Sequence, residues 1–247
     1  MECRLAVKRI FAVIFAAGMF AACGCSAQSG PASSLVHDAD FKLDGFQVKR
    51  VTDNTDCYNL QMDYPVLEQA GIDRQIRDWI NVKYDAITNE LNAVCAREKP
   101  DEPFKFWSEY DLYTTSRTVS LVFKTWLYAG GEQYFDTVET VNYLWNSGNA
   151  IGYKDLFAEP QGIFKSISSE VKGKLSPSLR TVWENHPEFD DGLEAAEHSF
   201  ENFAITETGL MIYFPTRQIA PFYAGPQRVD VPLGTLVRFA PKTDIWE

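Results

Sequence analysis

The chain has 247 residues and a mass of 28.0 kDa, enough for one large domain or two small ones. Its 34 acidic residues outnumber its 23 basic residues, and the formal net charge of -11 argues against nucleic-acid binding, which needs a basic surface. The same charge excludes adhesion to an anionic membrane by charge alone. With 3 histidines and 5 cysteines, neither a histidine-rich metalloenzyme nor a dense disulfide scaffold is expected.

The first 22 residues have the pattern of an export signal. Basic residues at the start precede an uncharged apolar run over residues 10–20, and small residues follow it. The run is too short to span a bilayer, which takes about 20 apolar residues. We therefore expect an exported protein that faces the periplasm or the exterior. An uncleaved membrane anchor is the alternative.

Cys23 is the expected site of a lipid. The run Phe20-Ala21-Ala22-Cys23 looks like a bacterial lipobox, in which the cysteine is acylated before the signal is cut, although Phe20 stands where Leu is usual. Cys25 is a second possible acylation site, and ordinary cleavage nearby is a further alternative. Residues 26–38 are small, polar and without periodicity, which is typical of a flexible tether.

Cys57 and Cys95 are the two cysteines of the folded part. Since exported proteins live in an oxidising compartment, they are predicted to form a disulfide that closes a loop of roughly 40 residues. Two unpaired thiols, or pairing with Cys25, are the alternatives. Neither cysteine lies in a known nucleophile motif, so a catalytic thiol is not expected.

The first half of the folded part predicts strands around one long helix. Residues 41–51 predict a strand, and the alternation over 58–64 predicts a second strand that ends at Pro65. An apolar stripe at three- and four-residue spacing from Ile72 to Val94 predicts a helix laid on a sheet.

The second half predicts more strands and then helices. Strands are expected at 106–115, 117–128 and 135–145, helices at 161–175 and 177–199 with a break at Pro187, a hairpin around Thr208-Gly209, a strand at 228–231, and a closing strand or short helix at 233–239. This order predicts an α+β fold in which antiparallel sheets carry helices on one face.

The sequence offers little sign of catalysis. The run Asp190, Asp191, Glu194, Glu197 and His198 could bind a cation from one helix face, but a solvated face of an acidic protein is the better explanation. No HExxH, EF-hand or G-x-S-x-G motif occurs, and sequence gives no separation for a glycosidase pair. We therefore expect no enzyme activity, no metal and no cofactor.

Two features are candidates for ligand binding. The loop 128–133 joins two predicted strands, and its glycines permit close approach of a partner, although a plain hairpin turn explains them as well. Trp107, Trp145 and Tyr223 lie near loops and are candidates for a binding face, with the core as the alternative. The residues selected as ligand-binding are Tyr128, Gly130, Gly131, Glu132 and Tyr223.

Three stretches together resemble the RsiV/PdaC-like family of bacterial extracytoplasmic domains. They are Tyr64-Pro65 before the long helix, residues 128–157 from the double glycine to Asp155-Leu156-Phe157, and residues 203–232 with Ala220-Pro221-Phe222-Tyr223. The third stretch is the most specific, and the resemblance covers about residues 40–240.

The resemblance implies an α+β fold of two intertwined subdomains, which we place at 40–104 and 105–247 after a signal peptide (1–22) and a lipidated tether (23–39). One branch of the family is the sensor part of anti-sigma factors that bind lysozyme, and another precedes a peptidoglycan deacetylase domain. We expect neither a cytoplasmic sigma-binding segment nor a deacetylase domain here. Glu132 and Gln133 stand where many members have a histidine.

Together these features predict a non-catalytic envelope lipoprotein that binds an envelope protein, for example lysozyme, or a peptidoglycan fragment. The acidic charge would speed capture of a basic protein such as lysozyme. The alternatives are a peptidoglycan-acting hydrolase, an accessory to a peptidoglycan deacetylase, and a structural envelope protein. Contact with a membrane is expected only through the lipid, and contact with nucleic acid is not expected.

Overall fold

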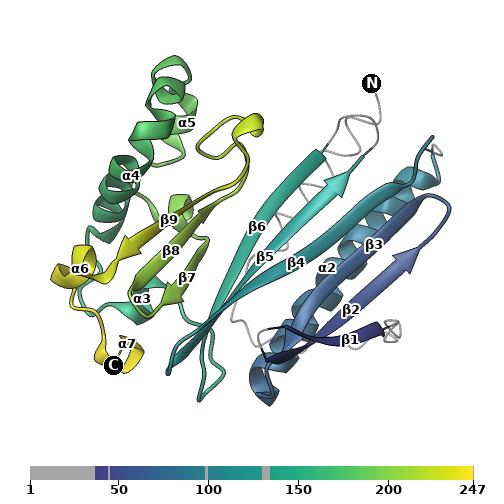
Figure 1. Cartoon of the computed structure of the whole chain (residues 1–247), viewed down its shortest axis with the longest axis horizontal. Helices are drawn as coiled ribbons and strands as arrows, with labels where there is room; N and C mark the ends of the chain where they lie inside the picture. The colour runs from purple at the N-terminus through teal and green to yellow at the C-terminus, as the bar shows by residue number, and fades with distance from the viewer. Residues whose placement is uncertain (1–36, 44, 98–99, 130–133, 247) are drawn as a thin grey trace. The chain divides into compact units, whose positions relative to one another are not determined.

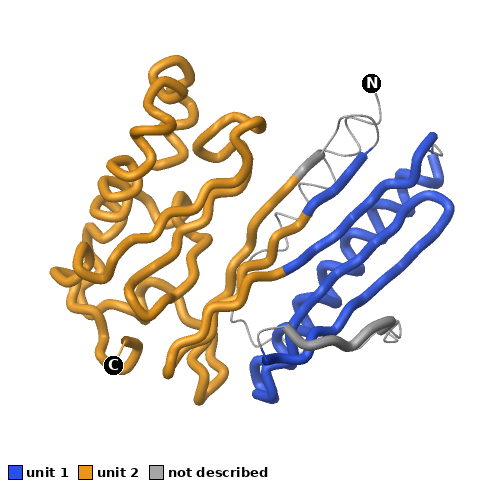
Figure 2. The backbone as a smooth tube through the Cα atoms, in the orientation of Figure 1, with its two compact units in different colours: residues 1–109, 126–135 blue, residues 110–125, 136–247 orange. Residues whose placement is uncertain are grey.

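The structure is a computed structural model that describes residues 37–246 apart from 44, 98–99 and 130–133. The predicted signal peptide and the acylation site Cys23 therefore lie outside the described residues. The chain forms two compact units, unit 1 with residues 1–109 and 126–135, and unit 2 with residues 110–125 and 136–247 (Figure 2). Each unit is thus built from two separate segments of the chain. A domain boundary between residues 104 and 105 stays a prediction.

The first sheet has six strands in the order β1-β2-β3-β4-β5-β6 (Figure 1). These are β1 (His37–Leu43), β2 (Phe46–Asn54), β3 (Tyr58–Val66), β4 (Phe104–Thr114), β5 (Thr118–Tyr128) and β6 (Tyr134–Leu144). β1, β2 and β3 pair antiparallel, but β3 and β4 pair parallel. Parallel neighbours need a crossover connection, and helix α2 (Ala70–Cys95) provides it. The sheet is therefore mixed within the predicted α+β class.

Two details of the first predicted strands are wrong. Residues 41–51 are not one strand, because the chain turns at Gly45 between β1 and β2, with a φ of 85° that favours glycine. Pro65 does not end β3, which continues to Val66. Pro65 lies beyond Met62, the last residue of β3 in register with β4, and proline is tolerated where a strand lacks a neighbour.

Helix α2 forms where the apolar stripe predicts it. The Gln69 side chain accepts a hydrogen bond from the Ile72 N–H (2.7 Å), and the buried Asp73 carboxylate accepts one from the Leu67 N–H (2.8 Å), so both side chains fix the start of the helix. The stripe from Ile72 to Val94 is buried, and Figure 1 shows α2 along one side of the strands of unit 1. Burial of one such side chain contributes about 1.5–3 kcal/mol.

Unit 2 contains a three-stranded antiparallel sheet, β7 (Phe203–Thr206), β8 (Gly209–Phe214) and β9 (Gln227–Pro232), in the order β7-β8-β9. Its helices and 3-10 turns are α3 (Tyr153–Leu156), α4 (Ile163–Asn185), α5 (Glu188–Asp191), η1 (Glu197–Phe200), η2 (Phe222–Ala224), α6 (Leu233–Leu236), η3 (Val237–Phe239) and α7 (Thr243–Trp246). Ile167 and Val171 of α4 lie in one buried core with Leu210 and Ile212 of β8. The predicted hairpin around Thr208-Gly209 is β7–β8.

The predicted helices at 161–175 and 177–199 are wrong in their bounds. α4 runs without a break from Ile163 to Asn185 and includes Pro177. Proline leaves the carbonyl four residues earlier, on Gly173, without its helical partner, and both residues are exposed, so water can bind that carbonyl. After α4 the chain forms only the short α5 and η1.

The outer edge of β7 is closed by side chains of β5 and β6. The Thr140 and Ser120 hydroxyls accept hydrogen bonds from the N–H groups of Phe203 and Ile205, both at 2.9 Å. The Asn142 amide donates to the Phe203 carbonyl at 3.0 Å. These bonds occupy backbone groups that an unpaired edge strand would otherwise offer to another chain.

Candidate functional site

The predicted ligand-binding residues are distributed over different parts of the chain. Gly130, Gly131 and Glu132 lie outside the described residues. Tyr128 belongs to unit 1 and Tyr223 to unit 2. Tyr128 is 8% exposed, and its hydroxyl donates to Glu102 Oε2 (2.7 Å). The structure therefore gives Tyr128 mainly a packing environment, whereas Tyr223 is open to solvent.

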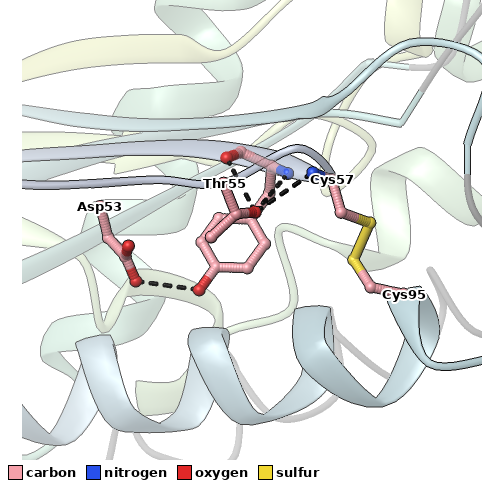
Figure 3. The surroundings of a disulfide bond; sticks show 5 residues. Asp53, Thr55, Cys57 and Cys95 are labelled. Carbon is pink, nitrogen blue, oxygen red and sulfur yellow. Dashed lines mark hydrogen bonds between the residues drawn. A yellow bond between two sulfur atoms is a disulfide. The ribbon is translucent and has the colours of Figure 1, made fainter.

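The predicted disulfide between Cys57 and Cys95 is present, and it joins the turn before β3 to the last residue of α2 (Figure 3). The Cα atoms are 6.1 Å apart, within the usual range for a disulfide. The Thr55 hydroxyl oxygen accepts hydrogen bonds from the N–H groups of Cys57 (3.2 Å) and Tyr58 (3.0 Å). The turn that carries Cys57 is thus also held by local hydrogen bonds.

Besides the disulfide, hydrogen bonds between side chains also connect β2, β3 and α2. The hydroxyls of Tyr58 and Tyr84 both donate to Asp53 Oδ2, each at 2.9 Å. Burial, with the hydrogen bond to Asp53 as the next cause, raises the pKa of Tyr58 and of Tyr84 to about 12. Both phenols therefore stay protonated as donors at neutral pH, so this cluster is a structural link.

The most exposed aromatic residues of the described chain lie together on one loop. The β8–β9 loop, residues 215–226, carries η2, in which Phe222 is 42% and Tyr223 82% exposed. Among the described residues, the other exposed large hydrophobic side chains are Val82 and Val237, which are aliphatic and stand singly. An adjacent exposed aromatic pair is the kind of feature that marks an interaction site.

The base of this loop is fixed by contacts with the rest of unit 2. The Gln218 amide donates to the carbonyls of Ser199 (2.8 Å) and Gly192 (3.2 Å). The Trp183 indole N–H donates to the Ile219 carbonyl (2.9 Å), and Ile219 itself is buried. The aromatic pair is therefore presented from a loop with an anchored base, which lowers the entropy lost on binding.

The charge beside the aromatic pair is positive. The Arg217 guanidinium lies 5.3 Å from the centre of the Phe222 ring, a cation–π distance. Arg217 has a φ of 72°, which is rare for a residue other than glycine and shows that the surrounding loop imposes its conformation. At the end of the loop the Gln227 amide donates to the Ala224 carbonyl (2.8 Å). The site offers aromatic surface and one cation.

The acidic run does not form the single helix face considered from the sequence. α5 ends at Asp191, whereas Glu197 and His198 lie in η1. Asp190 pairs with Lys172 of α4 at 2.7 Å. In the part of the chain that the structure describes, no group of His, Cys, Asp and Glu side chains has the arrangement of a metal site.

Comparisons with known proteins place this fold among domains without an assigned role. Residues 154–234 match the family described as "Protein of unknown function (DUF3298)". The chain is 20% identical over 193 residues to the peptidoglycan-N-acetylmuramic acid deacetylase PdaC of Bacillus subtilis (strain 168). The match covers 78% of this chain but 41% of that enzyme. These findings confirm the predicted resemblance to the PdaC/RsiV-like family of DUF3298 proteins.

Two solved structures have the same fold. A DUF3298 family protein from Pseudomonas aeruginosa PAO1 superimposes with a TM-score of 0.57 at 12% identity, over 82% of this chain and 97% of that chain. A DUF3298 family member from Bacteroides fragilis NCTC 9343 gives 0.54 at 13% identity, over 81% and 96%. At these identities the similarity establishes the fold alone. Separately, no helix among the described residues is long and apolar enough to cross a membrane.

The sequence analysis selected one of the three residues that stand out at this site. Tyr223 was a candidate, but Phe222 and Arg217 were not. The signal available for Phe222 was its position beside Tyr223, after Pro221, in a proline-containing stretch between two predicted strands. No pattern in the sequence predicts the positive φ of Arg217, because that conformation depends on the anchored loop around it.

Proposed function

We propose that this chain is an exported, non-catalytic binding module of the cell envelope that captures a protein partner through the β8–β9 loop. The observation that carries the proposal is Tyr223, 82% exposed in η2 of a loop whose base is anchored. A rigid aromatic side chain on a preorganised loop suits insertion into a concave partner surface. The net charge of -11 over the whole chain favours the approach of a basic protein such as lysozyme, whereas Arg217 at the loop itself would meet an acidic or polar group of that partner.

The similarity to the deacetylase PdaC also supports a role in the cell envelope. PdaC is named as a peptidoglycan deacetylase, and this chain spans about two fifths of its length. The second candidate, an accessory role beside a peptidoglycan deacetylase or a hydrolytic activity of the chain itself, rests on that similarity. Incubation of the protein alone with purified peptidoglycan, followed by measurement of released acetate and reducing sugars, tests the hydrolytic activity, and repeating it with an added peptidoglycan deacetylase tests the accessory role. Release of either product by the chain alone would contradict the non-catalytic proposal.

Replacing Tyr223 by alanine is the direct test of the loop. We expect the dissociation constant for lysozyme to rise at least about 10-fold, because a central exposed aromatic anchor contributes 2 kcal/mol or more in typical interfaces. The free energy of unfolding should stay unchanged because the side chain is exposed. Val237→Ala removes another exposed apolar side chain, 67% exposed in η3, and is the control. Titration calorimetry measures the binding, and equal affinity of both variants would refute the loop as the contact.

Varying the salt concentration distinguishes the effect of charge on the association rate from the effect of the loop contact on the dissociation rate. Exposed charges are screened over about 8 Å at physiological ionic strength. In surface plasmon resonance, high salt should therefore slow association of lysozyme while leaving dissociation nearly unchanged. Tyr223→Ala should instead speed dissociation. If no complex forms at high micromolar concentrations of lysozyme, lysozyme is excluded as the partner.

We further propose that the module is held at a bacterial membrane by a lipid on Cys23. The support is the lipobox-like run that ends at Cys23 and the polar tether after it. Cys23→Ala should release the protein from the membrane fraction or leave its signal unprocessed, whereas Cys25→Ala should not. Mass spectrometry of the membrane-bound protein tests this, and an unmodified Cys23 there would contradict it.

A further inference from the structure

One face of the sheet in unit 1 is not covered by any helix among the residues of that unit that the structure describes. Within its described residues α2 is the single helix, and it lies along one side of the strands (Figure 1). β4 alternates accordingly: Phe104 and Phe106 are buried, whereas Lys105 is exposed and Trp107 half-buried. The odd-numbered residues of this part of β4 therefore point to the second face of the sheet.

Two tryptophans of neighbouring strands form an aromatic pair on this face. The rings of Trp107 (β4) and Trp126 (β5) stack with centroids 5.7 Å apart and an interplanar angle of 16°. Both side chains are half-buried. Tyr128 follows Trp126 by two residues and so lies on the same face, where Lys105 Nζ is 5.2 Å from its ring centre. The result is a continuous aromatic strip across two strands.

The indole N–H groups of Trp107 and Trp126 differ in their hydrogen bonding from those of two tryptophans in unit 2. In unit 2 the indole N–H of Trp183 donates to the Ile219 carbonyl, and that of Trp246 to the Thr206 carbonyl. Within the described residues, the indole N–H groups of Trp107 and Trp126 have no hydrogen-bond partner, and neither is sealed from solvent. Tryptophan usually satisfies this donor inside a protein. Two donors are thus available to a ligand beside a flat apolar surface.

The polar side chains next to the strip balance each other in charge. Gln61 of β3 is in register with Trp107. The neighbouring strand pair carries Arg50 and Asp63, which form a two-point ion pair with both N···O distances at 2.7 Å. These groups bring hydrogen-bonding capacity without net charge, and Lys105 and Glu109 of β4, which share this face, add one charge of each sign. An uncharged ligand rich in hydroxyl and amide groups is complementary to such a face, and a polyanion is not.

We propose that the Trp107–Trp126 strip is a binding site for an N-acetylated glycan chain. Sugar rings present flat C–H surfaces that pack on indole rings, as apolar groups do generally. Acetamido carbonyls accept hydrogen bonds, which matches the two unpartnered indole donors. The chain's net charge of -11 disfavours anionic polymers and leaves a neutral glycan as the complementary ligand. This surface belongs to unit 1, whereas the β8–β9 loop belongs to unit 2.

The test uses the whole exported chain and oligomers of β-1,4-linked N-acetylglucosamine. Titration calorimetry should show binding at millimolar ligand or below, and glucose oligomers of the same linkage, which lack the acetamido group, should bind about 10-fold more weakly. The double variant Trp107→Phe, Trp126→Phe keeps both aromatic rings but removes both donors. It should lose the preference for the acetylated ligand. Trp183→Phe, which alters an internal hydrogen bond in unit 2, should keep that preference.

Each outcome decides one question. The proposal is overturned if acetylated oligomers do not bind at millimolar concentration, if both oligomers bind equally, or if the double phenylalanine variant keeps the wild-type preference. Trp107→Ala with Trp126→Ala should abolish binding, and circular dichroism checks that this variant folds. Tyr223→Ala should bind the glycan like wild type. Loss of glycan binding in Tyr223→Ala would assign the glycan to the loop and overturn this site.

Discussion

The double variant Cys57→Ser, Cys95→Ser should lose about 4 kcal/mol of unfolding free energy, because the disulfide closes a loop with a sequence separation of 38. In the chain-entropy model this loss arises in the unfolded state, which gains freedom when the crosslink is absent. Urea unfolding followed by fluorescence should give a lower midpoint. Wild-type protein unfolded with a reductant should show the same midpoint as the variant, which is the control for the two substitutions.

The folded state of this variant should change little. The Thr55 hydroxyl still binds the N–H groups of residues 57 and 58, and Asp53 still joins Tyr58 to Tyr84 of α2. Far-ultraviolet circular dichroism without urea should therefore resemble that of wild type. An unchanged urea midpoint would show that the disulfide contributes nothing, and a loss of helix signal before unfolding would show that α2 depends on it.

Gly192→Ala should destabilise the protein by about 2 kcal/mol and weaken ligand binding by the β8–β9 loop. A Cβ atom at Gly192 would lie 2.1 Å from the Gln218 carbonyl oxygen and 3.2 Å from Ile219 Cγ2, so the base of the loop must move. The φ of Gly192 is -63°, a value that alanine adopts readily, and the expected cost is therefore steric.

Gly173→Ala is the matched control for this substitution. Gly173 lies inside α4, and its added Cβ would meet nothing within 4 Å. Alanine there should raise the unfolding free energy by about 0.5–1 kcal/mol and leave binding unchanged. Urea unfolding and titration calorimetry measure both quantities for both variants. If Gly192→Ala binds lysozyme like wild type, the anchored base does not govern the loop.

The elements that sequence predicts well are those with long periodicity. The stripe from Ile72 to Val94 spans α2, and the glycine at position 209, with a φ of 153°, marks the β7–β8 hairpin. The turn at Gly45 was missed because the residues on both sides of it continue a mixed apolar and polar pattern. The continuity of α4 through Pro177 was missed because it depends on burial of the flanking residues Leu175 and Leu179 against the core of unit 2.

The candidate site was only partly predictable for a related reason. Tyr128 and Tyr223 look alike in sequence, as aromatic residues close to loops. Their exposure differs because Tyr128 packs beside Lys105 and Glu102, whereas Tyr223 lies in η2 of a loop that Gln218 anchors elsewhere. These are tertiary contacts between residues distant in sequence. No local pattern encodes them.

The closure of the β7 edge has a consequence for dissecting this protein. The segment that matches the DUF3298 family begins at residue 154, yet the groups that saturate the outer backbone of β7 belong to Ser120, Thr140 and Asn142. A fragment that begins at residue 154 would lack these side chains, so the outer backbone groups of β7 would be left unpaired. An unpaired strand edge of this kind can pair with another chain and lead to aggregation. The minimal unit for expression therefore begins upstream of β5, and the recognisable stretch of sequence is shorter than the piece that can fold cleanly.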